Sequence, residues 1–166
     1  MIIIGGTGYT AEIKKGNVAV GWVEAGGFVA TGIIAMSSMM GEGGNWTTAL
    51  GFFAVGQLLL LLVSVIYEMV TPWSVREEIR KGNASAGLKL GGLMVAVAVA
   101  IHGAIAVDFV SWSVNLTTLA VEGVIAVVLM MIVSWTVDRL FLPNTSIQTE
   151  IVRDQNIAAI SKVVAL

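Results

Sequence analysis

The stretch Glu12-Ile-Lys-Lys-Gly-Asn-Val-Ala-Val-Gly21 decides the fold, because the chain repeats it 66 residues later as Glu78-Ile-Arg-Lys-Gly-Asn-Ala-Ser-Ala-Gly87. In each copy a charged segment ends at the Asn, and a long apolar run follows. A third start, Glu150-Ile-Val-Arg-Asp-Gln-Asn-Ile-Ala-Ala159, occurs near the end of the 166 residues. Copies spaced in this way predict one structural unit that is used repeatedly.

Four apolar runs are long enough to cross a bilayer, which takes about 20 residues in a helix. They cover residues 18–40, 46–70, 84–107 and 116–137. Inside hydrocarbon the backbone must satisfy its own hydrogen bonds, so these runs predict helices. We therefore expect an all-α integral membrane helical bundle, with four transmembrane helices arranged as two parallel-repeat hairpins.

The composition supports a membrane protein and excludes several other classes. Apolar residues make up 57% of the chain, charged residues only 12%, and the mean hydropathy is +0.90. Soluble domains carry roughly 25% charged residues, and disordered chains are less hydrophobic. A net charge of -2 provides no basic face for nucleic acid, so we expect the lipid bilayer, and no nucleic acid, as a partner.

Charge placement predicts the orientation of the segments. The nine basic residues avoid the two short loops 41–45 and 108–115. The positive-inside rule then predicts cytoplasmic segments at 1–17 and 138–166, the latter containing the partial third repeat. Between these segments lie a first hairpin at 18–70, a cytoplasmic connector at 71–83 and a second hairpin at 84–137.

An asparagine stands just before each apolar run and predicts a helix N-cap. An N-cap side chain accepts a hydrogen bond from an orphan N–H group of the first turn, which stabilises a helix by about 1 kcal/mol. Two of these residues also match a glycosylation sequence, but capping explains all of them and is the favoured interpretation. The predicted N-caps are Asn17, Asn45, Asn83, Asn115 and Asn156.

Charged residues within the spans are the candidates for function, because they are expensive in hydrocarbon. Equal predicted depths allow two pairs, Glu24 with Lys89 and His102 with Glu122. These residues predict either a polar track for protons or small ions, or interhelical hydrogen bonds that set register, with Lys89 reaching the headgroups. One His and no Cys predict no metal site, and no catalytic set is visible.

Small residues recur at the start of both predicted in-to-out helices. Gly21 and Ala25 in the first helix correspond to Gly87 and Gly91 in the second. Faces of this kind let two helix backbones approach closely in a membrane. We expect them to pack the two helices at the centre of each protomer, or to form an oligomer interface.

The two Glu-Ile motifs and the glycine-rich runs that follow them resemble the YjfL-type family of uncharacterised bacterial inner-membrane proteins. The resemblance covers most of the chain, roughly residues 12–159. It implies paired transmembrane helices in the bacterial inner (cytoplasmic) membrane, a function that is not established, and no catalytic residues. It identifies no cofactor.

These observations predict a non-enzymatic membrane protein, and they leave two functions open. The first is a structural or accessory subunit of a homo-oligomer or of a larger membrane complex, which rests on the small-residue faces and the short loops. The alternative is a channel or transporter component with a polar track through the bundle, which rests on Glu24, Lys89, His102 and Glu122.

Overall fold

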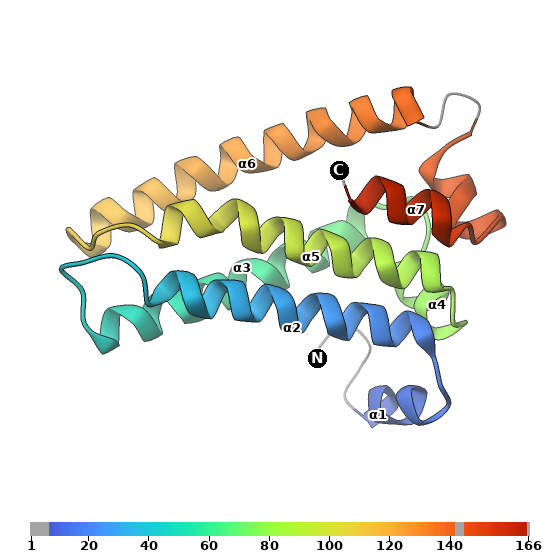
Figure 1. Ribbon diagram of the computed structural model, residues 1–166, viewed down its shortest axis with the longest axis horizontal. Coiled ribbons are helices and arrows are strands. Elements are labelled where there is room, and N and C mark those ends of the chain that lie inside the picture. The colour runs from blue at the N-terminus through green and yellow to red at the C-terminus, as the bar shows by residue number, and fades with distance from the viewer. Residues whose placement is uncertain (1–6, 142–144, 166) are drawn as a thin grey trace.

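The computed structural model describes residues 7–141 and 145–165, and in these ranges it is all-helical (Figure 1). The second helix of each hairpin follows the first through a short turn. The elements are α1 (Thr7–Lys14), α2 (Val18–Ser38), α3 (Trp46–Val70), α4 (Val75–Arg80), α5 (Ala84–Ile105), α6 (Trp112–Phe141), the π-helical turn η2 (Thr149–Arg153) and α7 (Ile157–Val164).

Three helices in the described residues have the length and composition to cross a membrane. These are α2, α3 and α5, with mean hydropathies of 1.6, 2.4 and 1.9. The shortest has 21 residues, which corresponds to about 32 Å of helix. The chain is therefore a multi-pass membrane protein. The expected fourth span, 116–137, falls within the 30-residue α6, where several side chains lie outside the described part of the chain.

The helices α2 and α5 run side by side in the same direction and form the centre of the molecule (Figure 1). Their contacts advance together along both helices, from Ala19 beside Gly87 to Ser37 beside His102. The helix α3 packs against both, α6 runs back along α5, and α7 lies on α5 below the far end of α6. The two copies of the repeat are thus parallel neighbours.

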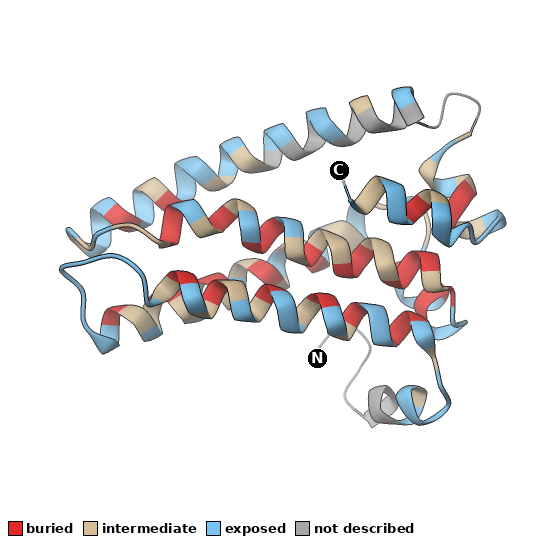
Figure 2. Ribbon diagram, viewed as in Figure 1, coloured by how far each residue is buried: buried red, intermediate tan, exposed pale blue. Residues whose placement is uncertain are grey.

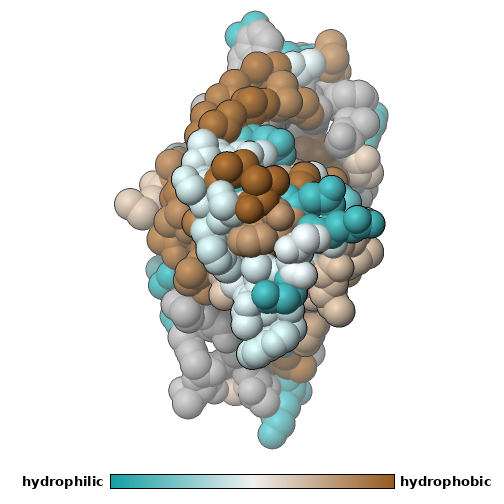
Figure 3. Space-filling view, turned by 90° about the vertical axis from the view of Figure 1, so that its left-hand side faces the viewer, coloured by the Kyte–Doolittle hydropathy of each residue, from teal (hydrophilic) through white to brown (hydrophobic). Residues whose placement is uncertain are grey.

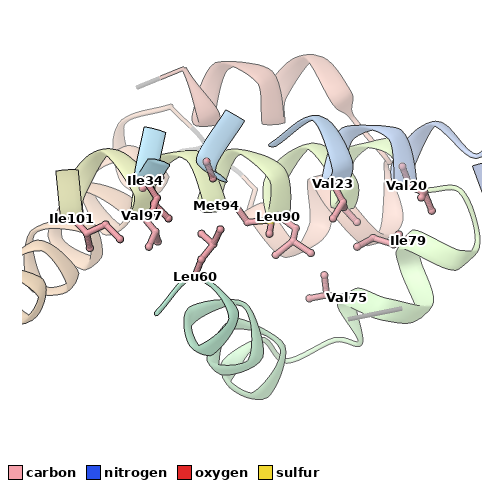
Figure 4. Close-up of a cluster of buried hydrophobic side chains, with 14 of the residues drawn as sticks. Val20, Val23, Ile34, Leu60, Val75, Ile79, Leu90, Met94, Val97 and Ile101 are labelled. Carbon is pink, nitrogen blue, oxygen red and sulfur yellow. The ribbon is translucent and has the colours of Figure 1, made fainter. Parts of the chain in front are cut away.

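The apolar core centres on α2, α3, α4 and α5 and includes Leu119 of α6, Ile151 of η2 and Ile160 of α7. Buried residues form stripes along α2 and α5 (Figure 2). By contrast, most described residues of α6 are exposed (Figure 2). Exposed apolar side chains are suited to contact with lipid. Figure 4 labels the central side chains Val20, Val23, Ile34, Leu60, Val75, Ile79, Leu90, Met94, Val97 and Ile101.

The turns after α2 and α5 lie at the end of the molecule that faces the viewer in Figure 3, and they are hydrogen-bonded to each other. The Glu42 N–H donates to Asp108 Oδ1 over 2.7 Å, and the Phe109 N–H donates to the Glu42 carbonyl over 2.8 Å. The rings of Phe52, Phe109 and Trp112 pack together beneath the turns. These contacts hold the two hairpins together at this end.

The predicted N-cap at Asn115 is wrong, because α6 begins earlier, at Trp112. The Ser111 hydroxyl accepts from the Val114 N–H over 3.2 Å and so takes the capping role. Asn115 lies inside the first turn and is 3% exposed. Its Oδ1 accepts from the backbone of the preceding loop, and its Nδ2 donates to the Asp108 carbonyl over 3.0 Å.

Candidate functional site

The Glu-Ile motifs fold into a compact joint between a short helix and a long one. In the first two motifs the short helix ends at a glycine in the left-handed region, Gly16 with φ +77° and Gly82 with φ +84°. The next residue donates its backbone N–H five residues back, from Asn17 to the Glu12 carbonyl and from Asn83 to the Glu78 carbonyl. This is the Schellman arrangement, and Gly takes the left-handed position because it has no Cβ.

The same asparagines then begin the long helices, so each one terminates one helix and caps the next. Asn83 Oδ1 accepts from the Ser85 and Ala86 N–H groups over 3.1 and 3.3 Å. Asn45 forms a capping box with Thr48. The structure places four of the predicted residues at N-caps, namely Asn17, Asn45, Asn83 and Asn156.

The third motif has one more residue between Glu and Asn, and the structure accommodates it locally. The π-helical turn η2 contains the additional residue, and Gln155 takes the left-handed conformation with φ 47°. Asn156 Nδ2 still donates to Glu150 Oε2 over 2.8 Å, as Asn83 Nδ2 does to Glu78 Oε2. The third copy therefore forms the same joint despite its changed sequence.

Each joint is tied to the next one by the asparagine amide. Asn17 Nδ2 donates to the Ile79 carbonyl over 3.0 Å, and Asn83 Nδ2 donates to the Ile151 carbonyl over 2.7 Å. Asn83 is only 1% exposed, so its bonds form away from water. We refer to these two bonds as the amide links. They set the register between successive repeats.

Glu78 stabilises the second joint because its carboxylate accepts hydrogen bonds from Asn83 and Lys81. Burial raises the pKa of its carboxyl, but the hydrogen bonds from Lys81 Nζ and Asn83 Nδ2, both 2.8 Å, lower it more. The net pKa lies below the ordinary value of 4.5. The folded joint therefore favours the ionised carboxylate.

Glycine permits the backbones of α2 and α5 to touch. A Cβ added at Gly87 would lie 2.2 Å from the Ala19 carbonyl oxygen, and one at Gly91 would lie 2.4 Å from that of Trp22. A Cβ at Gly26 would lie 2.4 Å from the Gly91 Cα. No larger residue fits at these positions without a backbone shift. The close packing predicted for Gly87 and Gly91 thus involves Gly26, which the sequence interpretation missed.

The prediction that Gly21 and Ala25 form the α2 half of this contact is wrong. Both residues are exposed, and a Cβ added at Gly21 would meet no atom within 4 Å. They lie on a different side of α2 from Gly26. The helices α2 and α5 point in the same direction and contact each other through different faces. Equivalent positions of the two repeats therefore do not face each other.

His102 is paired with a serine on the neighbouring helix. Its Nδ1 lies 2.7 Å from Ser37 Oγ, and Ser37 is fully buried. The Ser37 hydroxyl is also 2.6 Å from the Ile33 carbonyl. A hydroxyl donates one hydrogen bond, so when it donates to Ile33, the His102 Nδ1–H is the donor to Ser37. This pair joins α2 and α5 near the end of both helices.

Glu24 lines a groove between α2 and α3 together with Thr31 and Gln57. Thr31 Oγ1 donates to Gln57 Oε1 over 3.3 Å. The Gln57 Nε2 is buried and has no hydrogen-bond partner among the described residues. Met94 of α5 also lines this groove, whose cavity volume is about 450 Å³.

Lys89 and Glu122 line a separate groove between α5, α6 and α7, with a cavity volume of about 590 Å³. The four intramembrane candidates therefore do not form the expected pairs Glu24–Lys89 and His102–Glu122. The depth of a residue in the membrane follows from its place in the sequence, but the direction of its side chain depends on how the helix is rotated about its axis. Lys89 and His102 are 13 residues apart on α5, which places them on different sides of the helix.

The arrangement as a whole is suited to joining helices. Many of its polar side chains cap helices, link joints or pair across helices, whereas Glu24, Lys89 and Glu122 line grooves. No group of three or more His, Asp or Glu residues that could hold a metal ion forms in residues 7–141 and 145–165. The sequence interpretation missed Ser37, Thr31 and Gln57, whose small or neutral side chains carry little signal inside an apolar run.

The model of the family described as Domain of Unknown Function (DUF350) matches residues 41–166. A protein described as UPF0719 transmembrane protein, from Aquifex aeolicus (strain VF5), is 26% identical over 152 residues, which cover 89% of this chain and 56% of that protein. The chain thus spans just over half the length of this curated relative. No solved structure matches.

Proposed function

The chain belongs to the DUF350 family, which includes transmembrane proteins without an assigned activity, and from this premise we propose that it is a structural or accessory subunit of a membrane assembly. In this proposal it is not an enzyme. One observation carries the proposal: α2 has a second, exposed face of small residues, Gly21, Ala25 and Gly32, and among the described residues no atom lies within 4 Å of a Cβ added at Gly21 or Gly32.

The chemistry of helix association in lipid explains why this face supports assembly. Lipid is as apolar as leucine, so helices associate through close packing and hydrogen bonds, and interfaces are rich in small residues. The packed face of α2 shows how this chain uses glycine, with backbone-to-backbone contact at Gly26. If the face of Gly21, Ala25 and Gly32 were exposed to acyl chains instead, it would make few such close contacts.

We extend the proposal to topology and location. We propose that α6 is a fourth span, which returns the chain to the side on which it began. Both ends are then cytoplasmic, which the nine basic residues and the positive-inside rule support. The resemblance to YjfL-type proteins supports the bacterial inner membrane as the location.

A second candidate function is a channel or transporter component, and one observation favours it. The groove of Glu24, Thr31 and Gln57 contains an amide nitrogen without a partner among the described residues. Buried polar groups without partners are costly, and in membrane proteins polar residues often mark an ion or substrate path. The groove opens at α2 and α3, away from Lys89 and Glu122, so a continuous track through all four candidates receives no support.

Two measurements on the 166-residue chain separate these functions. Its mass in mild detergent and its ion flux in liposomes should show an assembly larger than one chain and no flux above empty liposomes. A chain that is monomeric and conducts ions, with flux lost in Glu24→Gln, would favour the channel and overturn the proposal. The Glu122→Gln variant is the matched control, because Glu122 lines the other groove.

A further inference from the structure

The stacking of the repeats on one another has a fixed register. Counted from its N-cap asparagine, α2 presents position 9 (Gly26) to position 8 of α5 (Gly91). The helix α5 presents its own position 9, Gly92, to position 8 of α7: a Cβ on Gly92 would lie 2.3 Å from Val164 Cγ1. The same pair of positions therefore meets twice, backbone to backbone from α2 to α5 and backbone to the Val164 side chain from α5 to α7.

The amide links follow the same order. The asparagine of each repeat donates to the carbonyl of the Ile in the next motif, from Asn17 to Ile79 and from Asn83 to Ile151. Each step thus combines one helix contact with one amide link. Both steps point in the same direction along the chain, because α2 and α7 lie on opposite sides of α5 (Figure 1).

The leading side of the first repeat is open. Gly21 and Ala25 occupy positions 4 and 8 of α2, which in α5 are Gly87 and Gly91, the residues that receive the preceding helix. Phe28, at position 11, is 73% exposed, whereas Met94 at the same position of α5 is 4% exposed. Ile13 is 41% exposed, whereas Ile79 is fully buried. In α5 this face is covered by α2; within the described part of the chain, no long helix covers the equivalent face of α2.

The trailing side of the last repeat is open in the complementary way. Asn156 is exposed, and its Nδ2 bonds to Glu150 of its own joint. Ala158 is also exposed, and it occupies position 2 of α7, which in α2 is Ala19, the residue that Gly87 contacts. The chain therefore carries both halves of a contact whose positions already meet twice internally.

We propose that the open face of α2 is covered by α7 of a second copy of this chain, in a head-to-tail contact that continues the internal stacking. In this contact Gly21 lies against Ala158 of the neighbouring copy, and the Asn156 Nδ2 of that copy donates to the Ile13 carbonyl. The inference rests on the proposed function, because it names the partner in the assembly. A head-to-tail contact is heterologous and builds a ring or an open array.

Continuity with the internal interface favours a second copy over lipid as the occupant. Every repeat begins on the same side of the bundle, so a further copy added by the same step stays in the same membrane plane. The Ile13 carbonyl already accepts from the Gly16 N–H, as the Ile79 carbonyl does from Gly82 while it also accepts the amide link. A carbonyl oxygen has two lone pairs, so Ile13 can accept the additional bond.

Cysteine cross-linking tests the contact directly, since the chain has no Cys. Copies carrying Gly21→Cys and copies carrying Ala158→Cys are co-expressed and oxidised in membranes, and we expect a disulfide-linked dimer. A disulfide forms only when the two Cα atoms lie within about 7 Å of each other. The proposed contact brings Gly21 and Ala158 that close, so these two positions should cross-link. The control pair is Gly21→Cys with Val124→Cys, and Val124 is exposed on α6. This pair should remain monomeric after oxidation.

A bulky substitution tests whether the face is needed for assembly. Gly21→Leu should leave the fold intact, because no atom lies within 4 Å of a Cβ there, and it should reduce the mass of the assembly to that of one chain. Gly103→Leu is the matched control, because Gly103 is an exposed helical glycine with equal free space. This control should assemble as the wild type does.

The outcomes separate this inference from the proposed function. Cross-linking of Gly21→Cys copies with each other, or no cross-linking of the pair, overturns the head-to-tail contact. If Gly21→Leu instead releases a different membrane protein, the proposed function stands and the second copy is the wrong partner. A wild-type chain that is monomeric and binds no other protein contradicts both.

Discussion

At the residue scale, Asn83 shows how one side chain can organise a helical membrane protein. It caps α5, links its joint to the third motif and bonds to Glu78, in four hydrogen bonds. It is 1% exposed, so water cannot replace a lost partner. Asn156 has the equivalent position in the third repeat but is exposed and makes fewer of these bonds.

Replacing these two asparagines should therefore have unequal effects. Asn83→Ala removes an N-cap and leaves buried groups without partners, which we expect to lower the free energy of unfolding by about 2–4 kcal/mol. Asn156→Ala removes an exposed cap and should cost only about 1 kcal/mol. Denaturant unfolding in detergent micelles, followed by circular dichroism, measures both. Equal losses would contradict the role assigned to the amide link.

The left-handed residue before each asparagine gives a second prediction at this scale. Gly82→Ala introduces a Cβ at φ +84° and should destabilise the protein by about 1 kcal/mol. Gln155→Gly should stabilise the protein or leave its stability unchanged, because Gln155 already has a Cβ at φ 47°. Thermal unfolding of both variants in one detergent gives the comparison. Destabilisation by Gln155→Gly would show that its conformation is not strained.

The lowered pKa of Glu78 predicts a dependence of stability on pH. A carboxyl whose pKa is lower in the folded state stabilises that state above its unfolded pKa, and this stability is lost as the pH falls through the folded pKa. The wild type should therefore lose stability as the pH falls below 4.5, the ordinary pKa of the Glu78 carboxyl. Glu78→Gln should lose less over this range than Glu77→Gln, a change at the exposed neighbour. Urea titrations between about pH 6 and pH 3 test this.

At the element scale, α2 and α5 depend on glycine at the contact between their backbones. Figure 4 shows buried side chains such as Val23, Leu90 and Met94 in the core that α2 and α5 share. At the glycine contact itself, an added Cβ would lie against backbone atoms of the other helix. Because the fit is backbone to backbone, a single methyl group is enough to disturb it. Glycines with free space lie in the same helices, so the two situations can be compared directly.

Adding that methyl group should have opposite effects at two glycines of α5. Gly91→Ala places a Cβ 2.4 Å from the Trp22 carbonyl oxygen and should destabilise the protein by about 1–3 kcal/mol. Gly103→Ala meets no atom within 4 Å and should be neutral or stabilise the helix by up to about 1 kcal/mol. Thermal unfolding in the same detergent measures both. A neutral Gly91→Ala would contradict the close packing of α2 and α5.

At the scale of the whole molecule, the protein is an array of stacked repeats with short turns at one end and joints at the other. The joints carry the Glu-Ile motifs, and the turns carry the hydrogen bonds between Glu42 and Asp108. Each repeat contacts its neighbours in sequence, as in other repeat architectures. The proposed topology places the joints, which carry basic residues, in the cytoplasm and the turns outside.

Labelling of single cysteines in intact cells tests this topology. An impermeant maleimide should label Glu42→Cys from outside, and it should label Glu77→Cys and Ser146→Cys only after permeabilisation. Ser146 decides whether α6 spans, because it follows that helix. Labelling of Ser146→Cys in intact cells would leave three spans. Permeabilised cells serve as the control for reactivity of all three positions.

Much of the architecture could be predicted from the sequence. The helices α2, α3 and α5 begin at the residues that the asparagines and apolar runs predict, since length, apolarity and capping are local properties. Asn115 was the exception, because Ser111 is a competing cap four residues earlier. The repeat and its parallel sense also follow from the motifs, because equal sequences form equal joints.

The candidate site was predictable only in part. The sequence identified Gly87 and Gly91 as packing residues but paired them with Gly21 and Ala25 instead of Gly26. It likewise paired Glu24, Lys89, His102 and Glu122 by depth, although these residues point into separate surroundings. Ser37 and Gln57 gave no signal, since neutral polar residues are common in membrane helices.

Sequence therefore settles which segments are helical, where they begin and that they repeat, because hydrogen bonding and apolar burial depend on residues close in the chain. Tertiary structure alone decides which side of each helix meets its neighbour. Successive residues turn by about 100° around a helix, so Gly21 and Gly26, five residues apart, lie about 140° apart, and the rotation of α2 about its axis decides which of them meets α5. That rotation is set by the amide links and the backbone contacts between repeats, which join residues more than 60 positions apart.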